Sequence, residues 1–377
     1  MCCFRKIVLL CTVLLMMGAF SGAFADEAAI PVGQERKFNR FFVWGRLADD
    51  ACARAAKEIG VTDITVNWKN PAELALAKKY GFKAYAKFGP QGARPQKITP
   101  QEMALQERLN GKDIPIPKNA SPEEKAALEK KRSEFRKASN TQWGGEPSPE
   151  AVEGDVLMDG IPCFAGEEAC EKSKAVLKKI CECNEIDGIA FDYIGYVNFK
   201  GCYCENCLKM YKQYIDDNKL IDDEKAKNAF YLKQLLDYNN SMVDYIKSLR
   251  PEFKVMAHLY PVFLPEPLYG NRLKVDYCGQ TAAWYCLWSP EKIRSYSAII
   301  SREQNKYFPG VTGVAFIGYY DSSHLPEFPH KTPERVELEL KAILDGGAEQ
   351  LMLCSMNDVI GNREIAEVFK KYCAGKH

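Results

Sequence analysis

Short apolar segments alternate with amphipathic segments from about residue 40 to the end of the chain. The apolar segments have strand length, and the segments between them have the apolar spacing of helices. Eight strand-then-helix units can be counted, with strands expected near residues 40–46, 63–68, 83–90, 187–196, 253–263, 274–288, 310–321 and 349–358. This alternation predicts a parallel sheet with its helices on the outside.

Eight such units in one chain predict a closed (β/α)₈ TIM barrel in the α/β class. An open, doubly wound sheet is the main alternative. It is disfavoured because the first strand is followed by "FVWGRLADD", in which Gly45 is the only glycine, so a glycine-rich phosphate loop is missing.

One charged segment, from about residue 91 to 156, interrupts the alternation after the third strand. Within it, Ser121, Pro122 and Glu124 have the spacing of a capping box with proline at the first helical position. We therefore expect a charged helical insertion in a barrel domain that covers residues 26–377.

The first 25 residues have the pattern of a secretory signal peptide. Arg5 and Lys6 precede the apolar run 7–17, and Ala23-Phe24-Ala25 precedes Asp26. The run is too short for a membrane span of about 20 residues, although a signal anchor remains an alternative. We expect an exported protein, periplasmic or secreted, with no membrane span after signal cleavage.

The charge balance argues against nucleic acid as a partner. Lysine and arginine number 51 against 50 aspartates and glutamates, a net charge of +1, whereas nucleic-acid binders carry a basic excess. The 19 tyrosines, 19 phenylalanines and five tryptophans offer flat surfaces that suit sugar rings. A carbohydrate partner fits this composition better.

In a (β/α)₈ barrel the active site lies at the carboxyl ends of the strands. Asp192 ends the apolar run "GIAFD" and is our first candidate for a catalytic carboxylate, whereas Asp187 and Asp276 begin their strands and are expected to be structural. Asp321 is preferred as the second carboxylate, followed by Glu266 and then Asp358. Expected substrate-binding residues at the strand ends are Trp44, Arg46, Asn67, Trp68, Lys87, Tyr193, His258, Tyr260, Gln280, Trp284, Tyr320, Asn357 and Asp358.

These side chains suit a glycoside hydrolase, because glycosidic cleavage commonly uses two carboxyl groups whose separation sets the stereochemical outcome. The alternative from another class is a catalytically inactive carbohydrate-binding barrel or a scaffold protein, which would keep the aromatic pocket without a working pair.

A cysteine cluster follows the fourth strand. Cys202, Cys204 and Cys207 form C-x-C-x-x-C, and one more thiolate would complete the tetrahedral shell of a structural zinc ion. Cys163 is the preferred fourth ligand, with Cys183 or Cys170 as alternatives. Disulfides and a redox role are the competing interpretations of the cluster.

Two motifs around this point resemble known carbohydrate-active families. "DGIAFDYIGY" resembles the D-G-I-x-F-D-Y-x-R-Y strand of bacterial glycosyl-hydrolase-like barrels, and "CYCENCLKMY" is similar to the C-x-C-x-x-C run of glycoside hydrolase family 42 β-galactosidases. In that family the three cysteines and a fourth from an upstream loop hold zinc, which implicates Cys202, Cys204, Cys207 and Cys163.

The resemblance has departures at the acids. Phe191-Asp192 stands where family 42 has Asn-Glu, Asp321 stands where it has a glutamate nucleophile, and Gly195 replaces the arginine of the strand motif. The resemblance therefore implies a carbohydrate-active barrel rather than a β-galactosidase activity.

Overall fold

The computed structural model describes residues 36–89, 121–128, 130, 163–165, 167–192, 194, 205–259, 268–284, 287–321 and 330–374. One compact unit, Lys37–His377, contains the whole barrel. The expected signal peptide and most of the expected insertion lie outside the described residues. Within the described ranges, no helix has the length and apolar composition needed to cross a bilayer.

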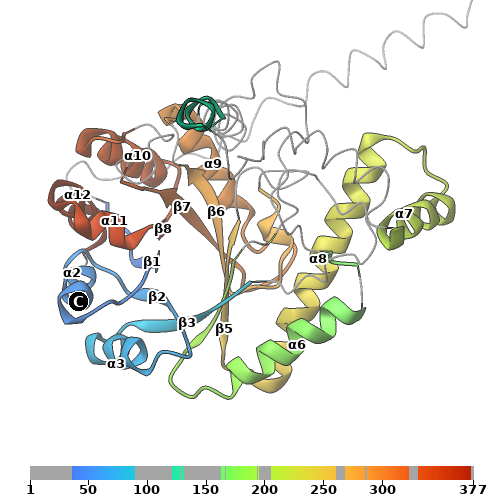
Figure 1. Cartoon of the computed structure of the whole chain (residues 1–377), viewed down its shortest axis with the longest axis horizontal. Helices are drawn as coiled ribbons and strands as arrows, with labels where there is room; N and C mark the ends of the chain where they lie inside the picture. The colour runs from blue at the N-terminus through green and yellow to red at the C-terminus, as the bar shows by residue number, and fades with distance from the viewer. Residues whose placement is uncertain are drawn as a thin grey trace, which may run out of the picture. The chain divides into compact units, whose positions relative to one another are not determined.

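Eight parallel strands close into a single barrel, so the predicted (β/α)₈ fold is confirmed (Figure 1). Each strand pairs with the next in the sequence, and the eighth pairs with the first. The strands are β1 (Arg40–Trp44), β2 (Asp63–Val66), β3 (Lys83–Phe88), β4 (Gly188–Phe191), β5 (Lys254–Leu259), β6 (Tyr277–Ala283), β7 (Thr312–Gly318) and β8 (Gln350–Cys354).

Helices surround the strands (Figure 1). They are α2 (Asp50–Glu58), α3 (Pro71–Tyr80), α6 (Glu167–Cys181), α7 (Glu205–Asn218), α8 (Glu224–Leu249), α9 (Pro290–Glu303), α10 (Pro333–Asp345), α11 (Met356–Gly361) and α12 (Arg363–Cys373), with a 3₁₀ turn η1 (Gly270–Arg272). The eighth strand is shorter than predicted. It ends at Cys354, because Ser355 caps α11 through a hydrogen bond from the Asp358 backbone N–H.

Several helices begin where the sequence places a capping residue before proline. Asn70, Ser289 and Thr332 each accept a backbone N–H of the first turn, and the next residue is proline in all three helices. In the insertion, the Ser121 N–H donates to Glu124 Oε2 at 2.8 Å and the Glu124 N–H donates to Ser121 Oγ at 3.2 Å. The predicted capping box is therefore confirmed.

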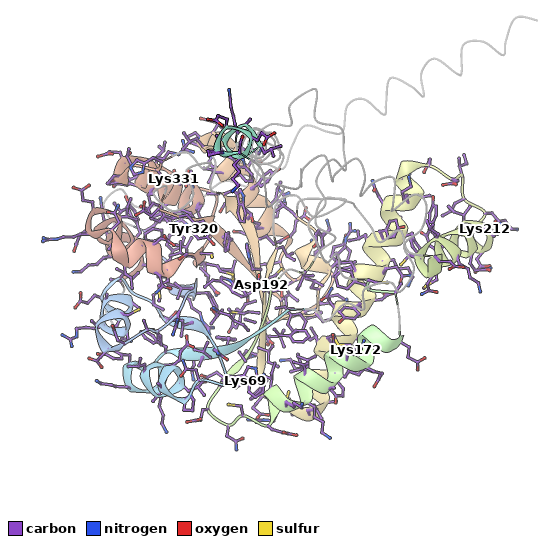
Figure 2. All side chains as sticks on the ribbon, viewed as in Figure 1. Lys69, Lys172, Asp192, Lys212, Tyr320 and Lys331 are labelled. Carbon is purple, nitrogen blue, oxygen red and sulfur yellow. The ribbon has the colours of Figure 1, made fainter. Side chains whose placement is uncertain are left out.

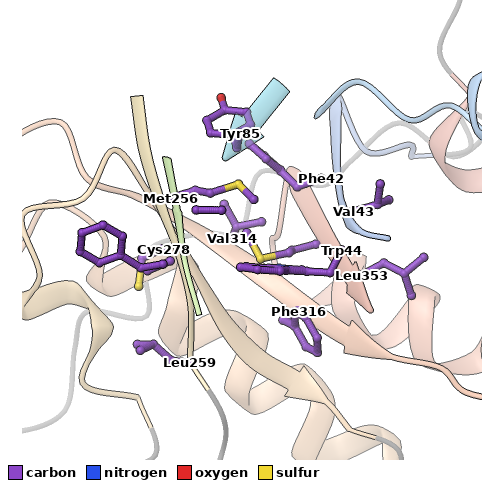
Figure 3. Close-up of a cluster of buried hydrophobic side chains, with 14 of the residues drawn as sticks. Phe42, Val43, Trp44, Tyr85, Met256, Leu259, Cys278, Val314, Phe316 and Leu353 are labelled. Carbon is purple, nitrogen blue, oxygen red and sulfur yellow. The ribbon is translucent and has the colours of Figure 1, made fainter. Parts of the chain in front are cut away.

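The barrel interior is filled by side chains in layers. At the amino-terminal end, Arg40 of β1 donates to Asp63 Oδ2 at 2.7 Å and also to Tyr277 of β6. Because β1 and β6 are not neighbours, these side chains meet inside the barrel. Above them lies an apolar layer, part of which is drawn in Figure 3. A Cβ atom on Gly279 of β6 would lie 2.3 Å from Met352 Sδ on β8, so a larger residue at this position would displace the methionine side chain.

The two acids at strand starts have structural roles, as predicted. Asp187 accepts from the Ala84 N–H at 2.9 Å and from Lys83 Nζ at 2.8 Å. Asp276 accepts from the Val255 N–H at 2.9 Å and from two lysines, Lys247 and Lys254. Both acids tie neighbouring strands together at the end of the barrel opposite the expected active site.

Candidate active site

A hollow of about 370 Å³ lies at the carboxyl ends of β1, β2 and β3. Three predicted substrate-binding residues line it, Arg46, Asn67 and Lys87, and all three side chains are exposed. Asn70 and Glu73, from the start of α3, complete its wall. These side chains are far apart in the sequence, but the fold brings them together at the carboxyl ends of the strands.

Glu73 lies on the buried side of the hollow and fixes two backbone segments of its wall. Its carboxylate accepts the Leu47 N–H at 3.2 Å and the Asn67 N–H at 3.0 Å, and the residue is only 2% exposed. This buried acid ties the segment after β1 to the segment after β2. Lys87 makes a similar link, because its Nζ donates to the Gly45 carbonyl at 2.9 Å.

Asn357 joins the hollow to the next part of the barrel mouth. Its Oδ1 accepts the Arg46 N–H at 2.8 Å, and its Nδ2 donates to the Arg46 carbonyl at 2.9 Å. The side-chain amide therefore fixes the backbone of Arg46 while the guanidinium group stays exposed. Asn357 lies in the first turn of α11, directly before Asp358.

Asp321 and Asp358 come together at the ends of β7 and β8. The Asp321 N–H donates to Asp358 Oδ1 at 3.3 Å. Burial raises the pKa of Tyr319, and the negative charges of Asp321 and Asp358 raise it further, so that both acids act on this ring. The side chain of Tyr320 turns toward β8, with its hydroxyl 3.4 Å from Cys354 Sγ. Two candidate acids and one predicted aromatic residue thus share this corner.

Asp192 follows β4 directly and is half-buried. Its N–H donates to the Phe88 carbonyl at 2.9 Å, which continues the pairing of β3 with β4 past the last strand residue. Figure 2 labels its side chain together with Tyr320 and Lys331. Around the barrel, β4 lies directly opposite β8, so Asp192 and Asp358 occupy opposite sides of the mouth.

Four of the predicted substrate-binding residues are buried. Trp44, His258, Gln280 and Trp284 are 5%, 2%, 3% and 1% exposed. The His258 ring stacks on Phe316 with a centroid distance of 3.6 Å, and burial lowers the pKa of His258 to about 3. His258 is therefore neutral at ordinary pH. Gln280 Oε1 accepts the Gly270 N–H at 2.8 Å. Contact of these four with a sugar stays a prediction.

Apart from Cys163 and Cys207, one of the remaining predicted site residues is described by the structure and five are not. Trp68 is half-buried, and Lys69 Nζ lies 5.2 Å from its ring centroid. Outside the described residues lie Tyr193, Tyr260, Glu266, Cys202 and Cys204.

The other two cysteines of the predicted metal site lie side by side. Cys163 Sγ and Cys207 Sγ are 3.6 Å apart, although 44 residues separate them, and both residues are buried. A disulfide would place the sulfur atoms about 2.05 Å apart, so these two are not bonded to each other. Cys207 lies in the first turn of α7, and the neighbouring Asn206 holds the other segment by donating to the Ala165 carbonyl at 2.7 Å.

Sequence reasoning missed the buried ion network beside β6 and β7. Lys331 Nζ donates to Glu339 Oε2 at 2.7 Å, to the Gly318 carbonyl at 3.0 Å and to the Trp284 carbonyl. Arg335 Nε donates to Glu339 Oε1 at 2.8 Å. The spacing of Arg335 and Glu339 by four residues was a visible signal for a helix pair. Nothing in the sequence around Lys331 indicates that its ammonium group is buried.

Comparison with solved structures finds the same fold in proteins of low sequence identity. The chain is similar to the PgaB (BpsB) glycoside hydrolase domain from Bordetella bronchiseptica, with a TM-score of 0.54 and 11% identity over 91% of this chain and 100% of that one. It is also similar to the β-galactosidase from the psychrophilic Marinomonas ef1, with a TM-score of 0.51 and 12% identity over 89% of this chain and 59% of that one.

A third similar structure is the cold-adapted β-galactosidase from Rahnella sp. R3, with a TM-score of 0.50 and 12% identity over 91% of this chain and 57% of that one. The chain thus spans less than two thirds of either β-galactosidase. No protein-family model and no curated protein matches the sequence. The predicted resemblance to glycoside-hydrolase barrels is confirmed at the level of the fold.

Proposed function

We propose that this protein is an exported glycoside hydrolase that cleaves a glycan through carboxylates at the mouth of the barrel. The observation that carries the proposal is the meeting of Asp321 and Asp358 at the ends of β7 and β8, with the Asp321 N–H 3.3 Å from Asp358 Oδ1. Asp192 follows β4 on the other side of the mouth. Similarity in fold to glycoside hydrolases supports the same conclusion.

The proposal gives different roles to the acids. An eight-stranded barrel is only wide enough inside for side chains to fill it, so acids on opposite strand ends can flank one sugar. In this proposal, Asp192 on one side and the Asp321–Asp358 corner on the other would supply the two carboxyl groups that glycosidic cleavage needs. Asp358 lies in the first turn of α11, whereas Asp321 closely follows β7 at the mouth, so we assign Asp321 as the partner of Asp192.

Hydrolysis of a panel of aryl glycosides and polysaccharides tests the proposal. We expect turnover of at least one substrate, and a loss of 100-fold or more in Asp192→Asn, in line with the usual contribution of a general acid or base, roughly 10²–10⁴-fold. Asp187→Asn is the matched control, because Asp187 precedes the same strand at the opposite end of the barrel. Asp321→Asn and Asp358→Asn identify the second acid.

Two results would contradict the proposal. Binding of a glycan without turnover of any substrate would favour a carbohydrate-binding barrel. Turnover that is the same in Asp192→Asn as in the wild type would remove Asp192 from the mechanism.

A structural zinc ion forms part of the same proposal. In a tetrahedral four-sulfur shell with zinc–sulfur bonds of about 2.3 Å, neighbouring sulfur atoms are about 3.8 Å apart. The 3.6 Å between Cys163 Sγ and Cys207 Sγ fits one edge of such a shell. Cys202 and Cys204 would supply the other two thiolates, and the ion would fasten the segment after β4 to the segment before α6.

Metal analysis of the full chain, purified under reducing conditions, tests the zinc site. We expect about one zinc per chain in the wild type and a clear loss of zinc in Cys207→Ser. Cys278→Ser is the control, since Cys278 is a buried cysteine on β6. Wild-type protein without zinc, or a Cys207→Ser variant that retains it, would exclude the site.

A further inference from the structure

The hollow beside β1, β2 and β3 has the size of a site for one sugar unit. Its volume of about 370 Å³ lies at the lower end of the range for small-molecule sites, about 300–1,000 Å³. Its wall combines two cations, two amides and one acid, namely Arg46, Lys87, Asn67, Asn70 and Glu73.

The charged side chains of this wall differ in how accessible they are to a ligand. The Glu73 carboxylate is 2% exposed and already accepts the Leu47 and Asn67 N–H groups. Arg46 and Lys87 are both exposed. A ligand in the hollow therefore meets positive charge, while the one negative charge is turned toward the backbone.

The two cations also keep hydrogen-bond donors for a ligand. Lys87 Nζ donates one bond, to the Gly45 carbonyl, and an ammonium group has three N–H donors. Within the described ranges, no acceptor takes a hydrogen bond from the Arg46 guanidinium, although Asn357 fixes the Arg46 backbone from both sides. The planar fork of an arginine suits an anionic group with two or more oxygens.

Helix α3 adds to the positive potential of the hollow. Its first residue is Pro71, and its capping residue Asn70 lines the hollow. The amino-terminal end of a helix carries a partial positive charge that favours a nearby anion.

We infer that this hollow is a subsite for an acidic sugar, and that it binds the carboxylate of a uronic acid or the sulfate group of a sulfated sugar between Arg46 and Lys87. The inference rests on the proposed function, because it names the substrate class of the same barrel mouth. Around the mouth, β1, β2 and β3 lie between β8, which is followed by Asp358, and β4, which is followed by Asp192. A sugar in the hollow is therefore flanked by candidate catalytic acids.

Ligand-observed NMR titrations of the full chain at low ionic strength test the subsite. Methyl β-glucuronide and glucose 6-sulfate are the acidic probes, and methyl β-glucoside is the neutral probe. We expect at least one acidic probe to bind more tightly than the neutral one, and its Kd to rise about tenfold in Arg46→Gln and in Lys87→Gln, the effect of one charged hydrogen bond. The preferred acidic probe distinguishes a carboxylate subsite from a sulfate subsite.

Two control variants remove the same charge elsewhere. Arg302→Gln changes an exposed arginine in the last turn of α9, and Lys83→Gln changes the lysine that begins β3. Both controls should bind the acidic probe as the wild type does. Equal binding of acidic and neutral probes, or the same loss in Arg302→Gln as in Arg46→Gln, would overturn the inference.

The subsite and the proposed hydrolase activity can fail separately. Preferential binding of an acidic probe that depends on Arg46, without turnover of any glycan, would support the subsite and contradict the hydrolase. Turnover of neutral glycosides that depends on Asp192, with equal binding of acidic and neutral probes, would support the hydrolase and overturn the subsite.

Discussion

Replacement of Lys331 by methionine tests how the barrel mouth is held together. Lys331 is 3% exposed, and its ammonium group donates to the Glu339 carboxylate and to the carbonyls of Trp284 and Gly318. Those carbonyls lie at the ends of β6 and β7. One buried side chain thus connects two strand ends to helix α10. Tyr320 and Asp321 closely follow one of these strand ends, Gly318.

The expected loss in the free energy of unfolding follows from the burial of Lys331 and from the partners that Glu339 keeps in the variant. Removal of one partner of a buried ion pair costs about 3–5 kcal/mol. Here Glu339 keeps Arg335, whose Nε lies 2.8 Å from Oε1, so the carboxylate is still paired. We therefore expect the lower end of this range, a loss of about 3 kcal/mol in the free energy of unfolding. Methionine fills a volume close to that of lysine, which limits any cavity.

Urea unfolding at pH 7 measures this loss, and Lys341→Met is the matched control. Lys341 lies in α10, the helix that Lys331 contacts through Glu339, and it pairs with Glu337 at 3.1 Å, but its side chain is 56% exposed. An exposed pair contributes about 0–1 kcal/mol. The midpoint should fall clearly in Lys331→Met and barely in Lys341→Met, with an unchanged dependence on urea. Equal and small losses in both variants would refute the view that burial makes Lys331 a stabilising connection.

Three further predictions concern the interior and the hollow. Because burial lowers the pKa of His258 from 6.5 to about 3, the unfolded chain binds a proton between these two pH values that the folded chain does not. The free energy of unfolding should therefore decrease as pH falls through this window, by up to about 1.4 kcal/mol per pH unit. If the free energy of unfolding of His258→Leu depended on pH as strongly as that of the wild type, this prediction would be wrong. Glu73→Gln should lower the free energy of unfolding by about 1–3 kcal/mol, measured by urea unfolding, because the glutamine amide cannot accept both backbone N–H groups equally well. A variant as stable as the wild type would contradict this prediction. Asn357→Ala should weaken acidic-sugar binding in NMR titrations, since it releases the Arg46 backbone, and an unchanged Kd would count against this.

The fold was predictable because its signal is distributed over the whole chain. Each strand is a short apolar run between turns, and helices begin at capping residues such as Asn70 and Thr332. The error at the end of β8 has a local cause. "EQLMLCSMND" continues the apolar pattern past Cys354, but the Ser355 side chain caps α11 and ends the strand. A serine inside an apolar run was the available signal for that boundary.

The candidate site was predictable as a set of positions, but its distances were not. The strand-end rule identified Arg46, Asn67 and Lys87, which line the hollow. It could not identify Glu73, because this acid belongs to the first turn of a helix. The pattern of apolar and polar residues also did not predict the burial of His258, since a strand-end histidine near the mouth can face either the sugar or the ring of Phe316.

The short helix α11 connects the two halves of the barrel mouth. Asn357 holds the backbone of Arg46 on the wall of the hollow, and the next residue, Asp358, accepts the N–H of Asp321 at the other corner. Because consecutive residues on a helix point about 100° apart, one helical turn reaches β1 with one side chain and the segment after β7 with the other. A rotation of α11 would move the cation wall and the acid corner together. In the proposed subsite, the position of this turn would set how far an anionic group bound to Arg46 lies from the carboxylates of Asp321 and Asp358.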